Sequence, residues 1–153
     1  MFDYTGRVVV LSGASSGLGK QMALAYADQG ADMVIMARRL ERLEELAKEI
    51  EAKGVKCLAI RCDVTDVESV NSAAAEAKEK MGRIDVVVNC AGASANAGVL
   101  EMTDEEWDFT IETDMTSVFY VTRAFGKYMK EANYGRIINI SSMYGLVGNT
   151  AID

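Results

Sequence analysis

The chain has 153 residues, the length of one domain that can bury its own core, and carries 23 acidic against 16 basic residues. The resulting net charge of -7 argues against a surface for nucleic acid or for an anionic membrane. The chain contains no histidine, which excludes a Ser-His-Asp hydrolase and a histidine-ligated metal site within it.

Strand and helix patterns alternate along the chain. We predict strands at Arg7–Ser12, Ala31–Ala37, Val55–Cys62, Ile84–Cys90 and Arg136–Ser141. Apolar residues at helical spacing predict helices at Gly17–Gln29, Leu40–Lys53, Asp66–Met81 and, from a capping box at Thr103, through about Ala132. This alternation indicates an α/β fold with a doubly wound parallel sheet of the Rossmann type.

Three cysteines, Cys57, Cys62 and Cys90, fit no metal-ligand spacing and predict reduced core thiols in a cytoplasmic protein. We therefore expect no metal. No apolar run is long enough to cross a bilayer, and the first strand is too short for the hydrophobic part of a secretion signal. We expect no membrane partner.

The stretch Val8–Gly19 joins the first strand to the first helix through a glycine-rich turn. Its glycines let the backbone approach a ligand closely, and the following helix directs free N–H groups and its positive dipole end at the loop. Such a turn favours a phosphate or pyrophosphate, with an ordinary strand-to-helix loop as the alternative. The candidate binding residues are Ser12, Gly13, Ser15, Ser16, Gly17, Leu18 and Gly19.

The second strand is followed by Arg38 and Arg39 rather than by an acidic residue. In a dinucleotide-binding sheet, an acid at this point binds a free ribose 2′-hydroxyl, whereas a basic residue pairs with a 2′-phosphate. Arg38 can meet a phosphate with a bidentate fork, and Arg39 can assist it. The pattern therefore favours NADP over NAD. The alternative is that both arginines merely flank a helix N-terminus, where a cation is unfavourable.

The glycine spacing of Ser12–Gly19 resembles the Thr-Gly-x-x-x-Gly-x-Gly loop of the short-chain dehydrogenase/reductase family, with Ser12 in place of the threonine. The run Asn89-Cys90-Ala91-Gly92 is similar to the family's Asn-Asn-Ala-Gly, from which Cys90 departs. The resemblance covers the whole chain. It implies that Asn89, Ala91 and Gly92 line the cofactor, that Asp63 binds the adenine amino group and that Val64 packs on the base. The alternative for Asp63 is an N-cap or turn acid.

The resemblance also implies a reaction, because the family interconverts alcohols and carbonyls by hydride exchange with nicotinamide. A tyrosine transfers the hydroxyl proton, and a nearby lysine lowers its pKa. The run Arg136–Ser142 resembles the family's fifth strand and serine, so Ser142 is the expected catalytic serine. The family's Tyr-x-x-x-Lys motif should follow, but the sequence ends at Asp153. We expect residues 1–153 to be a dinucleotide-binding Rossmann domain from a longer enzyme, inactive by itself.

A further departure is Asp114, which stands where the family has an asparagine. An aspartate lacks the NH2 donor, and if it were buried near the family's lysine it would pair with that lysine and disturb the proton relay. Its backbone carbonyl could still hold the family's water, so impaired and tolerated catalysis both remain open. We hypothesise that Asp114→Asn raises turnover in the complete chain.

The leading functional hypothesis is an NADP(H)-dependent oxidoreductase acting on a small alcohol or carbonyl compound. A sugar acid or polyol, a 3-oxoacyl thioester and a hydroxysteroid are the open substrate classes, with Ser94, Asn96 and Met143 as candidate contacts. The alternative is a non-catalytic dinucleotide-binding module or an inactive fragment. A methyltransferase-like sheet is disfavoured because the two arginines suit a phosphate better than nucleoside hydroxyls.

The predicted long helix carries the apolar residues Phe119, Tyr120 and Phe125. In the family this helix packs against its copy, so the resemblance implies a homodimer or homotetramer. The alternative is that these residues face the sheet, and both can hold for different faces of the helix.

Overall fold

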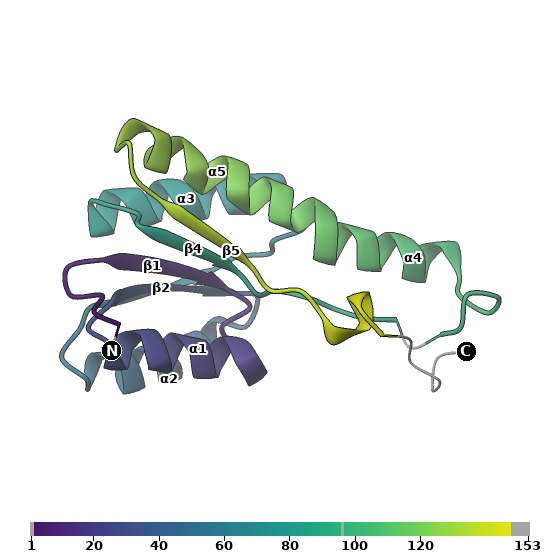
Figure 1. The fold of residues 1–153 in the computed structure, drawn as a ribbon, viewed down its shortest axis with the longest axis horizontal. Coiled ribbons are helices and arrows are strands. Elements are labelled where there is room, and N and C mark those ends of the chain that lie inside the picture. The colour runs from purple at the N-terminus through teal and green to yellow at the C-terminus, as the bar shows by residue number, and fades with distance from the viewer. Residues whose placement is uncertain (1, 96, 148–153) are drawn as a thin grey trace.

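Five parallel strands form one sheet in the order β3-β2-β1-β4-β5, and helices cover both of its faces (Figure 1). The computed structural model describes residues 2–95 and 97–147. The strands are β1 (Val8–Ser12), β2 (Asp32–Ala37), β3 (Cys57–Arg61), β4 (Val86–Asn89) and β5 (Arg136–Asn139). The helices are α1 (Gly17–Asp28), α2 (Leu40–Glu51), α3 (Val67–Met81), α4 (Asp104–Ile111) and α5 (Ser117–Glu131). The predicted α/β fold with its parallel sheet is confirmed.

β1 lies in the middle of the sheet because its side chains are apolar on both faces. All five of its residues are buried. Val10 pairs with Val34 of β2 on one side and with Val87 of β4 on the other. Continuous apolar runs of this kind are typical of parallel strands that are covered on both faces.

The sheet separates two hydrophobic clusters. On one face Val9 of β1 packs in a cluster with Leu43 of α2 and with residues of α1. On the other face Val10 packs in a cluster with Val70 of α3 and Phe125 of α5. Figure 1 shows the same arrangement, with α1 and α2 below the sheet and α3 and α5 above it.

Side-chain caps and glycines set the helix ends, and the predicted boundaries differ from the observed ones by at most two residues. Asp66 caps α3 by accepting a hydrogen bond from the Glu68 amide, and Gly82 ends that helix in the left-handed region. Thr103 and Glu106 form the predicted capping box of α4.

A π-helical turn interrupts the long helix, and this corrects the prediction of one regular helix from Thr103 to about Ala132. The turn spans Glu112–Thr116 and separates α4 from α5. The Ser117 amide donates to the Glu112 carbonyl, five residues back, so one extra residue is inserted into the helix. Periodicity does not reveal such a turn because the apolar spacing on either side of it stays helical.

β5 is an edge strand, with β4 as its single neighbour in the described part of the chain. Its residues Ile137 and Ile138 are 41% and 37% exposed. Because successive strand residues point to opposite faces, the sheet is open on both faces at this edge.

A buried carboxylate joins the opposite, amino-terminal ends of β1 and β4. Asp85 accepts hydrogen bonds from the Val8 amide at 2.8 Å, from the Arg7 guanidinium and from the Arg83 guanidinium. Burial works against the charged form, but the bonds from Arg83, Val8 and Arg7 hold the pKa of Asp85 below its usual value.

Candidate functional site

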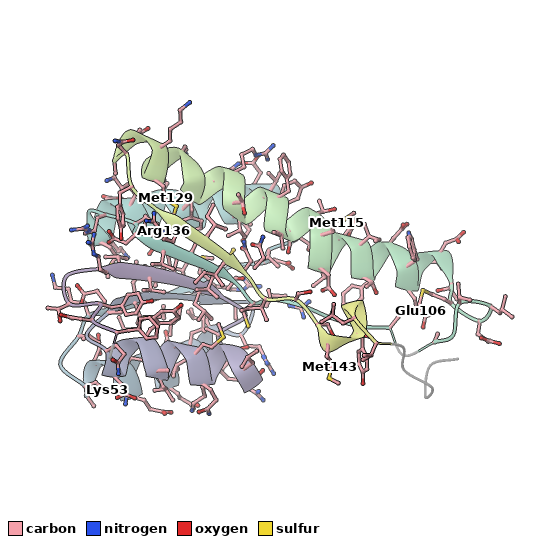
Figure 2. All side chains as sticks on the ribbon, in the orientation of Figure 1. Lys53, Glu106, Met115, Met129, Arg136 and Met143 are labelled. Carbon is pink, nitrogen blue, oxygen red and sulfur yellow. The ribbon has the colours of Figure 1, made fainter. Side chains whose placement is uncertain are left out.

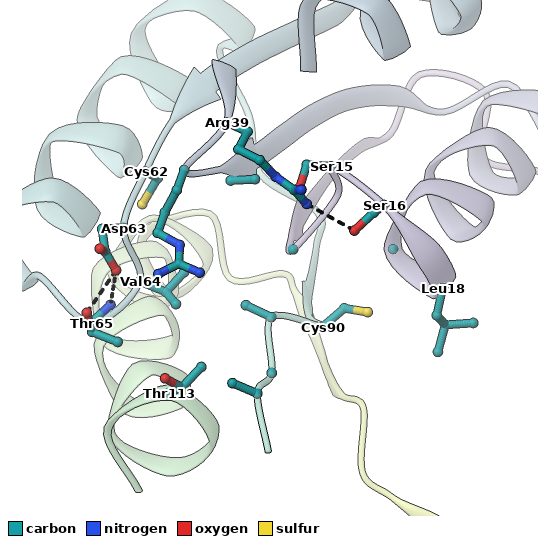
Figure 3. A pocket seen from close by; sticks show the side chains of 17 residues that line it. Ser15, Ser16, Leu18, Arg39, Cys62, Asp63, Val64, Thr65, Cys90 and Thr113 are labelled. Atoms are coloured by element: carbon teal, nitrogen blue, oxygen red, sulfur yellow. Dashed lines mark hydrogen bonds between the residues drawn. The ribbon is translucent and has the colours of Figure 1, made fainter. Parts of the chain in front are cut away.

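A cavity of about 570 Å³ lies at the carboxyl ends of the strands. This is the edge at which open α/β sheets bind their ligands. Figure 3 shows side chains from the loops after β1, β2, β3 and β4 converging there. The lining residues are Gly13, Ser15, Ser16, Leu18, Gly19, Ala37, Arg38, Arg39, Cys62, Asp63, Val64, Thr65, Cys90, Ala91, Gly92, Ala93 and Thr113.

The loop after β1 approaches its neighbours so closely that two positions require glycine. A Cβ on Gly13, whose φ is +74°, would lie 2.7 Å from the Ala91 amide nitrogen. A Cβ on Gly19 would lie 2.3 Å from the Gly13 carbonyl oxygen. Gly17 differs, since it does not line the cavity and a Cβ there would meet nothing within 4 Å, although its φ of +54° favours glycine.

The N-terminus of α1 borders the cavity without a side-chain cap. Ser16 is the N-cap residue, yet its side chain makes no capping bond, and the first turn holds no acidic residue. The Ser15 and Ser16 hydroxyls instead accept hydrogen bonds from the Arg39 guanidinium at 3.0 and 3.2 Å (Figure 3). Free helix amides beside a guanidinium favour an anion at this point.

Arg38 and Arg39 bring two exposed guanidinium groups to the cavity. Within residues 2–95 and 97–147, neither forms an ion pair with a carboxylate. Arg39 is also the N-cap residue of α2, where its charge opposes the helix dipole. It is Arg39, expected only to assist Arg38, that reaches across to the glycine loop.

Asp63 follows β3 and is partly committed to its own turn. Its Oδ1 accepts hydrogen bonds from the Thr65 amide at 3.1 Å and from the Thr65 hydroxyl at 2.8 Å. The turn fixes the carboxylate at the cavity wall, next to the buried Val64. Both predicted readings of Asp63 are therefore compatible with its position, as a turn acid and as a cavity residue.

Ser12 lies under the cavity rather than in its wall. It is buried, and its hydroxyl oxygen accepts hydrogen bonds from the Cys90 and Ala91 amides at 3.1 and 3.2 Å. The same hydroxyl donates to the Val88 carbonyl. Ser12 thus joins the loops that follow β1 and β4.

Asn89 does not line the cavity. Its side-chain amide nitrogen donates to Asn139 at 2.8 Å and to Thr122 at 3.3 Å, which places the side chain between β5 and α5. Cys90 lines the cavity instead. Adjacent strand residues point to opposite faces, so one of the two had to turn away.

Asp114 is exposed, not buried, and belongs to the π-helical turn. Its Oδ1 accepts a hydrogen bond from the Ala93 amide at 2.8 Å. Gly92 lies beside it, since a Cβ there would come within 3.4 Å of the same oxygen. The carboxylate thus holds the loop after β4 against the long helix.

Ser142 lies outside the cavity lining, in the exposed segment after β5. Its hydroxyl accepts a hydrogen bond from the Tyr144 amide at the start of a short 3-10 turn. Of the candidate substrate contacts, Ser94 bonds its hydroxyl to the Ala95 carbonyl and Met143 is 67% exposed. Asn96 and Asp153 lie outside the described residues.

Within the described ranges, no group of three or more Cys, Asp and Glu side chains is placed to hold a metal ion. No helix in that same part of the chain is both long and apolar enough to span a bilayer.

Comparison with known proteins assigns the chain to a family. A family model described as short chain dehydrogenase matches residues 7–152. The chain belongs to the short-chain dehydrogenase family. The sequence resemblance is thereby confirmed.

Curated relatives of this short-chain dehydrogenase are longer proteins. The oxidoreductase UcpA of Salmonella typhimurium is 38% identical over 145 residues, covering 95% of this chain and 55% of that protein. The NADP-dependent mannitol dehydrogenase of Alternaria alternata is 35% identical over 153 residues, covering 97% of this chain and 58% of the relative. The chain therefore spans little more than half the length of these relatives.

Solved structures share the fold. A short-chain type dehydrogenase/reductase from Mycobacterium marinum has a TM-score of 0.93 and 36% identity, covering 97% of this chain and 60% of the other. A metagenomic short-chain oxidoreductase in complex with NADP has a TM-score of 0.89 and 33% identity, covering 97% of this chain and 67% of the other. An NAD⁺-bound xylitol dehydrogenase has a TM-score of 0.92 and 30% identity, covering 97% of this chain and 57% of the other.

Within the short-chain dehydrogenase cavity, two residues stand out that the sequence does not single out. Thr113 reaches the wall from the π-helical turn, and Cys90 replaces Asn89 in the lining. Neither spacing nor composition marks Thr113, because its place in the wall depends on the π-helical turn.

Proposed function

We propose that this chain is the nucleotide-binding part of an NADP(H)-dependent oxidoreductase that interconverts an alcohol and a carbonyl on a small substrate. One observation carries the cofactor preference: Arg38 and Arg39 line the cavity after β2, and neither has a carboxylate partner in the described residues. Guanidinium groups suit a ribose 2′-phosphate, whereas a free 2′-hydroxyl calls for an acid here.

The remaining walls of the cavity support the same proposal. The uncapped N-terminus of α1 suits a pyrophosphate, and the close packing of Gly13 against Ala91 fixes the loop that precedes this helix. In the described part of the chain, only Oδ1 of Asp63 is used in its turn, so Oδ2 is available to an adenine amino group. Apolar Val64 suits the face of the base.

The bound cofactor would supply or accept the hydride. The residues of this chain would bind and orient. Asp114 holds Ala93 and with it the loop beside the cavity, and Ser142 would hold the substrate oxygen. No tyrosine in the sequence is followed by lysine four positions on, so none of its tyrosines is assigned the proton transfer.

The relatives support the reaction class more firmly than the cofactor. Among those compared, the mannitol dehydrogenase is named NADP-dependent and one solved structure holds NADP, but another holds NAD⁺. The decisive test is titration of the full-length protein with NADPH and NADH, followed by nicotinamide fluorescence. We expect NADPH to bind at least about tenfold more tightly, a difference of about 1.4 kcal/mol.

Variants test whether Arg38 and Arg39 set the cofactor preference. Exchange of both Arg38 and Arg39 for Ala should weaken NADPH binding much more than NADH binding. Arg42→Ala, an exposed position on α2 outside the cavity lining, is the matched control. Equal affinity of the unaltered protein for the two cofactors would overturn the NADP preference.

A second assay separates an enzyme from a non-catalytic binding module. The full-length protein is supplied with NADPH and a panel of polyol-derived, 3-oxoacyl and steroid ketones, and NADPH oxidation is recorded. Oxidation with one class supports the oxidoreductase and identifies its substrate class. Binding of NADPH without oxidation of any member supports the binding module.

We also propose that the protein forms a homo-oligomer and that it resides in the cytoplasm. Phe125 is buried against the sheet, whereas Trp107, Met115 and Phe119 on the long helix are 57%, 62% and 56% exposed. Figure 2 shows Met115 on the long helix, away from the sheet. These exposed residues support a homodimer or homotetramer, which sedimentation velocity would test.

The three free cysteines suit a reducing compartment such as the cytoplasm.

A further inference from the structure

Thr113 is a buried polar residue in the cavity wall whose hydroxyl is unpaired. The residue is 9% exposed and contributes to the lining. Its Oγ1 has no hydrogen-bond partner among residues 2–95 and 97–147. A buried hydroxyl without a partner is unfavourable, and a valine of the same shape would avoid that penalty.

The Thr113 hydroxyl lies in the π-helical turn and does not bond the backbone there. A threonine in an α-helix can bond its hydroxyl to a carbonyl three or four residues back. In the turn Glu112–Thr116 the backbone ladder is shifted by one residue, and the Thr113 side chain makes no such bond. Two contacts hold the turn in place, one at the residue after Thr113 and one at the Thr113 carbonyl itself. Asp114 binds the Ala93 amide, and the Ser117 hydroxyl binds the Thr113 carbonyl.

The position of Thr113 in the cavity limits the part of a ligand that it can contact. Figure 3 shows Thr113 below Val64 and Thr65, and across the cavity from Ser15 and Ser16. It therefore lies on the wall where the proposed function sets the adenine base, remote from the serines that face the phosphates.

We infer that Thr113 is a nucleotide-binding residue that donates a hydrogen bond to a ring nitrogen of the adenine base. Threonine populates two side-chain rotamers in helices, so rotation about its Cα–Cβ bond exchanges the positions of the hydroxyl and the methyl group. With the base in the cavity, the hydroxyl turns towards it and gains the partner that the fold does not supply. This inference rests on the proposed binding of an adenine dinucleotide.

The test compares Thr113→Val with Thr113→Ser in the full-length protein. Calorimetry measures binding of NADPH, adenosine 2′,5′-bisphosphate and nicotinamide mononucleotide, and urea unfolding measures the stability of the ligand-free protein. We expect the valine variant to bind NADPH and the bisphosphate about tenfold more weakly, as for the loss of one hydrogen bond. The serine variant should bind them as the unaltered protein does. Nicotinamide mononucleotide, which lacks adenine, should bind equally to both variants and to the unaltered protein.

Stability provides the second readout. The valine variant should be at least as stable as the unaltered protein without ligand, because it loses an unpaired buried hydroxyl. Thr110→Val is the helix control, since the Thr110 hydroxyl already bonds the Glu106 carbonyl and lies outside the cavity lining.

Two results would overturn the inference while the proposed function stands. One is equal NADPH binding by the valine variant, and the other is a loss of ligand-free stability that accounts for weaker binding. If the unaltered protein binds neither NADPH nor the bisphosphate, the proposed function itself fails.

Discussion

The Asp114 carboxylate accepts a hydrogen bond from the Ala93 backbone amide at 2.8 Å, across 21 residues of sequence. The contact joins the π-helical turn to the loop after β4. An asparagine could make the same contact through its own Oδ1, so the aspartate differs from the family's residue in charge rather than in this bond.

Asp114→Asn in the full-length protein should therefore preserve stability and raise turnover. The substitution keeps the acceptor for Ala93 and removes a negative charge from the region where the family's lysine is expected. Steady-state oxidation of NADPH with a turned-over ketone measures the effect. Equal or lower turnover in the asparagine variant would refute the hypothesis. Asp114→Leu is the matched control. It removes the acceptor of an exposed hydrogen bond and should lower the free energy of unfolding by about 0.5–1.5 kcal/mol.

Gly13→Ala should destabilise the fold more than Gly17→Ala. Both residues have positive φ, for which an added Cβ costs about 1–2 kcal/mol. At Gly13 the Cβ would also lie 2.7 Å from the Ala91 backbone, whereas at Gly17 it would meet open space. Urea unfolding of both variants separates the cost of the positive φ, which both share, from the cost of the close contact with Ala91. Equal losses would mean that the Ala91 loop shifts freely to admit a methyl group.

Asp85 should make stability depend on acid pH. Its pKa is lowered in the folded protein, so its contribution is complete above the unfolded-state pKa of about 4 and is lost as pH falls through the folded value. Asp85→Asn should remove that acid dependence and, because hydrogen bonds to a charged group are lost, lower stability at neutral pH by about 1.5–3 kcal/mol. Urea unfolding at a series of pH values measures both effects. The exposed Glu44→Gln is the control, and an unchanged acid slope in Asp85→Asn would contradict the assignment.

Cys90 should react slowly with iodoacetamide at neutral pH, and bound NADPH should slow it further. Burial raises the pKa of Cys90, which limits the thiolate, but the side chain is partly exposed in the cavity. Burial raises the pKa of Cys57 to about 12 and that of Cys62 to about 11, so these thiols should react later. Peptide mass spectrometry follows each site. Labelling of Cys90 that NADPH leaves unchanged would argue that the nucleotide does not cover it.

The strands and the position of the site could be predicted because the governing signals are local. Val8–Leu11 and Val86–Val88 are apolar without alternation, which is what a parallel strand buried on both faces requires. The loops after such strands must meet at one sheet edge, so the sequence alone predicts that the glycine loop, the arginines and Asp63 lie together.

Side-chain direction could not be predicted in the same way. Whether Asn89 or Cys90 faces the cavity depends on where β4 ends, and the structure ends it at Asn89. The π-helical turn depends on one hydrogen bond shifted by a residue, from the Ser117 amide to the Glu112 carbonyl. Neither choice alters composition or spacing, so the sequence does not mark Thr113 as a cavity residue.

The hydroxyl of Ser12 clamps the loops after β1 and β4 through backbone groups alone. The contacts of this hydroxyl therefore do not depend on the side chains of Val88, Cys90 and Ala91, whereas the rim of the cavity consists of exchangeable side chains such as Arg38, Arg39 and Asp63. A few substitutions at the rim should therefore change what the cavity can bind without loosening the two loops beneath it.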